Sequence, residues 1–161
     1  MKGVSLVRVT KSNIAHIRKL KVAKHQGRYI DPAKDTIRLA TSEETHNKQR
    51  VIYWLRGIKY KGRHVGLVLV RLNAPPYLHT ARDYQPGAYL NRLMIDVGSQ
   101  GLGIGSHVVT QVKDYVRSLG YDRLYLSCVV GKHSPIEFYK KLGFRLTGNR
   151  IWGEKEMVTT V

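Results

Sequence analysis

Over residues 93–119 an apolar segment runs into a glycine-rich turn, and the turn runs directly into the strongest helical pattern of the chain. The turn holds three glycines in five residues, Gly101, Gly103 and Gly105. Glycine lets a backbone turn tightly and approach a ligand closely. The free N–H groups and the dipole at the start of a helix attract phosphates. This unit therefore predicts an α/β fold with a phosphate-binding turn after one strand.

Two common nucleotide-binding motifs do not fit this turn. A Walker A loop needs Gly-Lys-Ser/Thr after its second glycine, and the turn has no lysine. A G-x-G-x-x-G fingerprint fails because its last position is Ser106 when counted from Gly101, and Val108 when counted from Gly103. The spacing Gln-x-x-Gly-x-Gly from Gln100 remains.

Strand-like and helix-like segments follow one another along the rest of the chain, in the order βααβββαβαββ. Residues 73–87 carry three prolines and are expected to form a loop. Ser134 with Pro135 and Glu137 predicts a capping box for the last helix. No repeat or linker divides the chain, so one domain over 1–161 is expected. The expected strands are 4–10, 51–60, 64–72, 88–97, 124–130, 144–152 and 155–161, and the expected helices are 12–26, 31–48, 104–119 and 134–142.

Two signatures together resemble the GNAT superfamily of N-acetyltransferases. The turn resembles its acetyl-CoA signature, Q/R-x-x-G-x-G/A between a strand and a helix. Residues 136–144, Ile-Glu-Phe-Tyr-Lys-Lys-Leu-Gly-Phe, resemble its short helix with a Phe-Tyr pair before Leu-Gly-Phe. The resemblance covers 88–148 most firmly. It implies an α/β domain with a mixed, mostly antiparallel sheet of about seven strands, splayed at the fourth and fifth strands and flanked by about four helices.

The resemblance implies acetyl-CoA as the cosubstrate and assigns its binding residues. The pyrophosphate would lie on the backbone amides of the turn, and the pantetheine arm would pair with the preceding strand. An amide near Ile95 would hold the oxyanion that forms from the thioester. The implied binding residues are Leu93, Met94 and Ile95 on the strand and Gln100, Gly101, Leu102, Gly103, Ile104, Gly105 and Ser106 in the turn and helix start.

Tyr139 matches the general acid of the family. A phenol with a pKa of roughly 10 is a reasonable proton donor to a leaving thiolate whose thiol has a pKa of roughly 8.5. Core packing is the alternative role for this side chain. Lys132 stands where many members have Asn, seven residues before the tyrosine, and is expected either to reach a CoA phosphate or to be exposed.

The general base is left unassigned by the sequence. Many members carry a Glu near the strand before the turn, where this chain has Asn91 and Arg92. A water chain or one of His64, His79 and His107 is the alternative, although a lone histidine is more often structural. No histidines show metal-ligand spacing with Cys or carboxylates, so no metal site is expected.

The charge of the chain is large and uneven. Its 28 Lys and Arg outnumber 11 Asp and Glu, giving a formal net charge of +17, and 18 of those cations lie within residues 1–82. Such a field attracts nucleic acid, acidic protein, anionic lipid or phosphorylated ligands, or is simply solvated. Aromatic residues among the cations would stack on bases, but their place on strands favours core packing. These aromatic residues are Tyr29, Tyr53, Trp54 and Tyr60.

The expected reaction is acetyl transfer to a primary amine by direct attack in a ternary complex, with a small amine or polyamine favoured. Residues 92–96 with the two signatures resemble the diamine and polyamine (spermidine/spermine) branch. A polycation needs several carboxylates, however, and the positive field opposes it. The alternatives are an amine on an anionic macromolecule, such as aminoacyl-tRNA or a ribosome-associated protein, and a non-catalytic acetyl-CoA-binding module. The acids available for an acceptor site are Asp31, Asp35, Glu43, Glu44, Glu154 and Glu156.

The compartment is expected to be the cytoplasm. No apolar run approaches 18 residues, so no membrane association is expected, and the N-terminal segment is a poor signal peptide. The single cysteine, Cys128, excludes an internal disulfide framework. A homodimer is compatible with the resemblance, because dimers are common among similar proteins.

Overall fold

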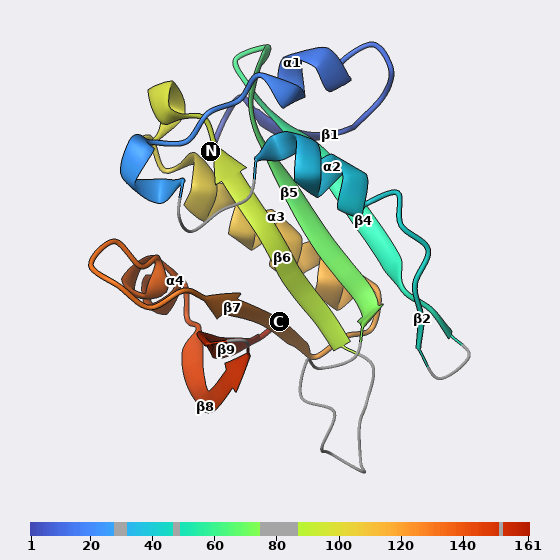
Figure 1. Cartoon of the computed structure of the whole chain (residues 1–161), viewed down its shortest axis with the longest axis vertical. Coiled ribbons are helices and arrows are strands. Elements are labelled where there is room, and N and C mark those ends of the chain that lie inside the picture. The colour runs from blue at the N-terminus through green and yellow to red at the C-terminus, as the bar shows by residue number, and fades with distance from the viewer. Residues whose placement is uncertain (28–31, 47–48, 75–86, 152) are drawn as a thin grey trace.

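A mixed seven-stranded sheet carries the fold, with the strand order β1-β4-β5-β6-β7-β9-β8 (Figure 1). The computed structural model describes residues 1–27, 32–46, 49–74, 87–151 and 153–161. Within them β6 and β7 pair in parallel, and the other neighbours in the sheet are antiparallel. The strands are β1 (Val4–Arg8), β4 (Ile52–Tyr60), β5 (Arg63–Ala74), β6 (Gly87–Ile95), β7 (Arg123–Cys128), β8 (Arg145–Ile151) and β9 (Glu154–Thr160), with a separate small hairpin of β2 (Thr45–His46) and β3 (Gln49–Arg50).

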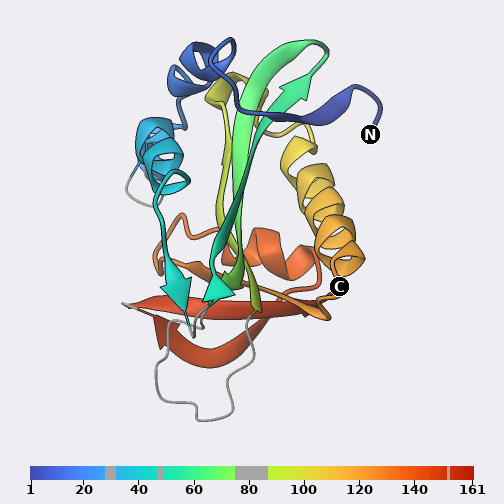
Figure 2. The same cartoon turned by 90° about the vertical axis from the view of Figure 1, so that its right-hand side faces the viewer.

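Helices cover both faces of the sheet. Figure 2 shows α1 (Ile14–Arg18) and α2 (Ala33–Leu39) on one side of β4, β5 and β6, and α3 (Ile104–Ser118) on the other. These sides are called the α2 face and the α3 face below. The remaining elements are α4 (Ile136–Lys141), which follows β7, and two single turns of 3₁₀ helix, η1 (Lys24–Gln26) and η2 (Val97–Ser99). In the described part of the chain, no helix has the length and apolarity needed to cross a bilayer.

The helical spacing of apolar residues in the sequence correctly predicts which residues of α3 form the core. Val108, Val112 and Val116 of α3 are fully buried against the α3 face, as the helical pattern predicts. A second cluster on the α2 face contains Ile17 of α1 and Met94 of β6. The expected fold class and the splay at the fourth and fifth strands are confirmed.

The splay lies between β6 and β7. These strands pair only at Ala88 with Leu124 and at Tyr89 with Tyr125. The pairing of β6 with β5 shifts register between Leu69 and Val70 of β5, which leaves Asn91 as a bulge. A bulge bends its strand, and β6 leaves β7 just beyond this point. The sheet therefore opens between the carboxyl-terminal half of β6 and the end of β7.

The expected helix over 12–26 is shorter than predicted. α1 ends at Arg18, and 3₁₀ helix η1 begins only at Lys24. Between them the Lys21 amide donates to the Asp96 carboxylate at 2.9 Å, and the Lys21 carbonyl accepts from the Val97 amide at 2.7 Å. These bonds to a segment 75 residues away replace the bonds of a continued helix.

The expected helix over 31–48 is also shorter. α2 ends at Leu39 because the Thr41 and Ser42 hydroxyls donate to the carbonyls of Arg38 and Leu39, each at 2.7 Å. The chain then lies along the sheet.

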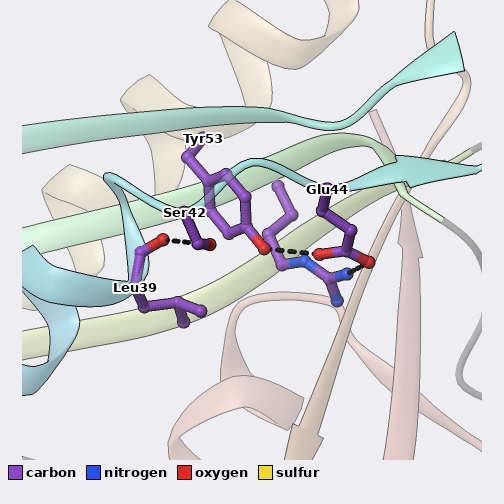
Figure 3. A network of polar contacts seen from close by, with 5 residues as sticks. Leu39, Ser42, Glu44 and Tyr53 are labelled. Atoms are coloured by element: carbon purple, nitrogen blue, oxygen red, sulfur yellow. Dashed lines mark hydrogen bonds and ion pairs between the residues drawn. The ribbon is translucent and has the colours of Figure 1, made fainter.

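A polar network fastens this segment to β4 and β5. Glu44 accepts from the Tyr53 hydroxyl at 2.5 Å (Figure 3) and pairs with Arg71 at 2.7 Å. The Arg71 side chain is only 5% exposed. Burial, and then the bond to Glu44, raise the pKa of Tyr53. Tyr53 is thus a packing residue, as its place on a strand predicts.

The predicted capping box before α4 is wrong. Pro135, at φ −78° and ψ 9°, occupies the N-cap position, and no side chain caps the helix. The Ser134 hydroxyl is buried without a hydrogen-bond partner among the described residues. Glu137 pairs instead with Lys140 at 2.8 Å. The near-helical backbone of Pro135 moves the helix start past the serine.

Candidate active site

A cleft of about 530 Å³ occupies the opening between β6 and β7. Its walls come from β6, the glycine-rich turn, the start of α3, the end of β7 and α4. Val22 and Gln26 of the N-terminal segment and Glu154 of β9 complete the lining. The cleft therefore joins a phosphate-type turn to the gap in the sheet.

Six consecutive backbone amides, from Gly101 to Ser106, form no hydrogen bond with any described residue. Gly101 and Gly103 adopt left-handed φ angles of 75° and 76°, and Gly103 is the N-cap of α3. Turned amides at the start of a 15-residue helix form an anion-binding nest. A Cβ at Gly105 would lie 3.4 Å from the Phe138 ring, so a glycine keeps this part of the cleft open. These features fit the pyrophosphate of acetyl-CoA.

The turn is held by residues 21–26, which follow α1 and include η1. The Gln100 side-chain amide donates to the Gln26 side-chain oxygen at 2.8 Å and to the Ile95 carbonyl at 2.9 Å. Asp96 accepts from the Lys21 amide on one carboxylate oxygen and from the Gly98 amide on the other. Gln100 thus supports the turn from the side of its own strand and from the N-terminal segment.

The open edge of β6 offers backbone groups to a ligand. The Asp96 amide donates to the Val65 carbonyl at 2.7 Å, so Asp96 and Met94 direct their backbone groups toward β5. Because alternate residues of a strand face opposite neighbours, Leu93 and Ile95 direct theirs toward the gap. The Ile95 carbonyl is already bonded to Gln100. The Ile95 amide and both groups of Leu93 can therefore pair with an extended ligand such as a pantetheine arm.

The structure brings most of the predicted site residues together but not all. Met94 is 3% exposed and packs on the α2 face. Leu102 is 49% exposed and, like the exposed Lys132, lies outside the cleft lining. The predicted residues that line the cleft are Leu93, Ile95, Gln100, Gly101, Gly103, Ile104, Gly105, Ser106 and Tyr139.

Tyr139 reaches the cleft from α4 and is 9% exposed. Its ring contacts those of Phe138 and Phe144 edge-on, with centroids 5.0 and 5.5 Å away. Burial, and then the neighbouring Cys128, raise the pKa of Tyr139. Burial, and then Glu154, raise the pKa of Cys128 to about 12. Tyr139 and the Cys128 thiol are therefore both protonated at neutral pH.

Glu154 is a site residue that the sequence identifies only as one of six acids available for an acceptor site. It begins β9 and accepts a hydrogen bond from the Ser127 hydroxyl of β7. Among the described residues that line the cleft, it is the one carboxylate. Glu154 and Ser127 are far apart in the chain, and only the pairing of β7 with β9 brings them together.

Of the histidines considered as bases, His64 and His107 do not line the cleft. The His64 ring stacks on that of His16 at a centroid distance of 6.0 Å. The pKa of His64 is lowered, mostly by burial and to a smaller extent by Lys59 and His16. His107 Nδ1 lies 3.2 Å from the Met1 amino nitrogen. His79 is outside the described residues, as are Asp31 and Tyr29. The histidine that does line the cleft is His133.

Glu156 and Trp54, two further residues considered for the site, have structural surroundings. Glu156 is 3% exposed and accepts from Thr147 and Asn149, each at 2.9 Å. Trp54 is 8% exposed and stacks on Tyr115 at 4.3 Å. Both side chains are therefore occupied by packing, which agrees with the core role expected for Trp54.

The sequence matches the acetyltransferase (GNAT) family over residues 14–144, which includes the turn, the open strand and Tyr139. The chain belongs to this family. A search of curated proteins finds no match. The predicted enzyme class, an acetyl-CoA-dependent acyltransferase, is confirmed at the level of the family.

Solved structures of this family share the fold at low sequence identity. PaiA N-acetyltransferase of Thermoplasma acidophilum, in complex with coenzyme A, aligns with a TM-score of 0.66 and 14% identity over 98% of this chain and 99% of that one. The ribosomal-protein-S18-alanine N-acetyltransferase of Escherichia coli aligns with a TM-score of 0.65 and 15% identity over 98% and 94%. A GNAT acetyltransferase of Elizabethkingia anophelis with acetyl-CoA bound aligns over 100% of both chains, with a TM-score of 0.60 and 16% identity.

Proposed function

We propose that this chain transfers acetyl from acetyl-CoA to a primary amine by direct attack in a ternary complex. The observation that carries the proposal is the single cleft that joins the free amides of the turn, the open edge of β6, Tyr139 and Glu154. The turn would hold the pyrophosphate, and the Ile95 amide would polarise the thioester carbonyl. The PaiA and ribosomal-protein-S18-alanine enzymes that share the fold are also N-acetyltransferases.

In the proposed reaction the amine nitrogen attacks the thioester carbonyl carbon, and the carbon–sulfur bond breaks as the tetrahedral oxyanion collapses. Glu154 binds the acceptor as an ammonium group and accepts the first of the two protons that its nitrogen loses, which frees the lone pair for attack. The second proton leaves the nitrogen after the carbon–nitrogen bond forms and restores the Tyr139 phenol once that phenol has given its own proton away. Tyr139 gives its phenolic proton to the departing sulfur. Burial raises the pKa of the neighbouring Cys128 thiol to about 12. Burial also disfavours a bare CoA thiolate beside Tyr139, so transfer of the phenolic proton to the sulfur is favoured as the sulfur leaves.

The acceptor we favour carries one ammonium group. Among described residues the cleft lining provides one carboxylate, Glu154, and one permanent cation, Arg92. A polyamine needs several carboxylates, so the polyamine branch suggested by residues 92–96 has less support in this cleft than a small monoamine. An amine carried on an anionic macromolecule is the second candidate, and the positive charge of the chain favours it.

The test is acetyl-CoA-dependent thiol release against an acceptor panel of small monoamines, diamines, spermidine, N-terminal peptides and aminoacyl-tRNA. Glu154→Gln should lower kcat/KM about tenfold or more at neutral pH, because the ammonium loses its carboxylate. Asp114→Asn, which changes an exposed carboxylate on α3, is the matched control and should leave the rate unchanged. CoA binding without thiol release for every acceptor would overturn the proposal and favour a non-catalytic binding module.

A further inference from the structure

One end of the molecule carries exposed cations that have no acidic partners. Nine such side chains, called the basic end here, lie in the segment from Lys2 to Lys24, which contains β1 and α1, and at the β4–β5 turn. None of them forms an ion pair with a described residue. They are Lys2, Arg8, Lys11, Arg18, Lys19, Lys21, Lys24, Lys61 and Arg63.

Exposed cations elsewhere on the chain are often paired. Arg117 lies 2.9 Å from Asp114, and Lys140 lies 2.8 Å from Glu137. Arg50 and Arg123 also have carboxylates within 4 Å. Unpaired exposed cations also occur elsewhere among the described residues, at Lys34, Arg38 and Arg145 for example, but the basic end differs because none of its nine cations has a carboxylate partner.

Backbone and ring contacts join the elements of the basic end into one surface. The Lys61 amide donates to the Gly3 carbonyl at 3.0 Å, which places the β4–β5 turn beside the start of β1. The stacked rings of His64 and His16 join Arg63 to α1, where Arg18 and Lys19 follow. The upper part of Figure 1 shows α1 and β1 together at this end of the sheet.

The phosphate turn lies at the same end. The bonds of Lys21 with Asp96 and Val97 tie the segment after α1 to the turn. Both oxygens of Asp96 already accept backbone amides, so this carboxylate is occupied. The basic end thus extends the positive potential of the turn well beyond the phosphates of one CoA molecule.

We propose that the basic end binds the phosphate backbone of a nucleic acid. A polymer with one charge per nucleotide matches many separate, unpaired cations. A membrane surface or a stable protein interface would need apolar anchors. Ile17 of α1 is fully buried. The exposed large apolar residues at this end are Met1 and, on the phosphate turn, Val97 and Leu102, and none of them lies on α1. Phosphate contacts carry no base information, so binding is expected to be insensitive to sequence.

The test measures fluorescence anisotropy of a labelled 30-nucleotide RNA, the same sequence as single-stranded DNA, and a 30-base-pair duplex, all with saturating CoA. With about five phosphate contacts, affinity for the single strands should fall about 10²-fold between 50 and 200 mM salt. RNA and DNA are expected to bind alike. No binding at 50 mM salt, or binding that CoA abolishes, would overturn the proposal. So would binding only to phosphatidylserine vesicles or to polyglutamate.

A matched pair of triple variants locates the surface. Arg18→Gln, Lys19→Gln and Arg63→Gln together should weaken binding at least tenfold and reduce the salt slope by about 2. The control, Lys34→Gln, Arg38→Gln and Arg145→Gln, removes the same charge from exposed, unpaired positions of the described chain. It should change affinity less than threefold. Equal losses would show a diffuse charge effect and overturn the proposal.

A measurement on the unsubstituted protein tests the same surface without relying on variants that could misfold. Bound RNA should protect Lys19 and Lys61 from acetylation by an N-hydroxysuccinimide ester, while Lys140 and Lys141 remain reactive. Uniform protection, or protection confined to the second pair, would contradict the proposed surface.

Discussion

Along its β5 edge, strand β6 pairs in both halves, from Gly87 to Ile95, whereas along its β7 edge it pairs only at Ala88 and Tyr89. On the closed edge a Cβ at Gly66 would lie 2.3 Å from the Met94 carbonyl oxygen. On the open edge the free backbone groups face a cleft. The two edges of β6 thus have different roles. The edge paired with β5 fixes the position of the strand, and the open edge leaves backbone N–H and C=O groups for a ligand.

The largest expected effect comes from breaking the closed edge. Gly66→Ala should destabilise the fold by about 4 kcal/mol or more, because the new methyl group meets backbone that has no room to move. Urea denaturation followed by circular dichroism measures the loss.

Gly98→Ala is the control for this substitution, since the nearest atom to its Cβ is a side-chain oxygen of Asp96 at 3.6 Å. It should cost less than about 1 kcal/mol. Equal stability of the two variants would show that β5 and β6 are less tightly joined than described.

The next effect tests the open edge without disturbing the fold. Tyr139→Phe keeps the packing on Phe138 and Phe144 but removes the proton donor, so kcat should fall about 10²-fold with little change in stability. Steady-state thiol release and thermal unfolding measure the two quantities.

The pH dependence follows from the same residue. Burial and Cys128 raise the pKa of Tyr139, so its protonated form persists above pH 10, and the rate should not decline on the alkaline side because of this group. An alkaline limb near pH 9 that disappears in Tyr139→Phe would contradict the assigned surroundings.

Two glutamates on β9, one buried in the fold and one lining the cleft, are expected to respond differently to the same substitution. Glu156→Gln should cost about 1–3 kcal/mol of stability, because the buried carboxylate accepts from Thr147 and Asn149. Glu154→Gln should change stability by less than about 1 kcal/mol and act on the rate instead, since Glu154 is partly exposed in the cleft. Denaturation curves for both variants measure the two losses of stability. A larger loss for Glu154→Gln than for Glu156→Gln would contradict the roles assigned to the two residues.

The smallest expected effect lies in the turn. Gly105→Ala places a methyl group 3.4 Å from the Phe138 ring, so KM for acetyl-CoA should rise about threefold with kcat nearly unchanged. Ser106→Ala, which leaves the backbone amide in place, should not alter KM. A similar rise for Ser106→Ala would mean that the Ser106 hydroxyl, and not only the backbone amides, holds the ligand.

Local patterns explain what the sequence predicts well. The glycine turn, α3 and the place of Tyr139 on α4 depend on residues close together in the chain. The errors depend on distant contacts, such as the bonds of Lys21 to Asp96, or on a competing local geometry, as at Pro135. Glu154 could be counted among the acids but not placed, because its position depends on the register of β9 with β7.

The bond between Gln26 and Gln100 also has a consequence in time. It joins residues 74 positions apart, and at synthesis rates of about 5–20 residues per second roughly 4 to 15 seconds separate the arrival of its two partners. During that interval the segment after α1 has been made but cannot take its final place. The part of the chain that is translated first is therefore among the last to be completed.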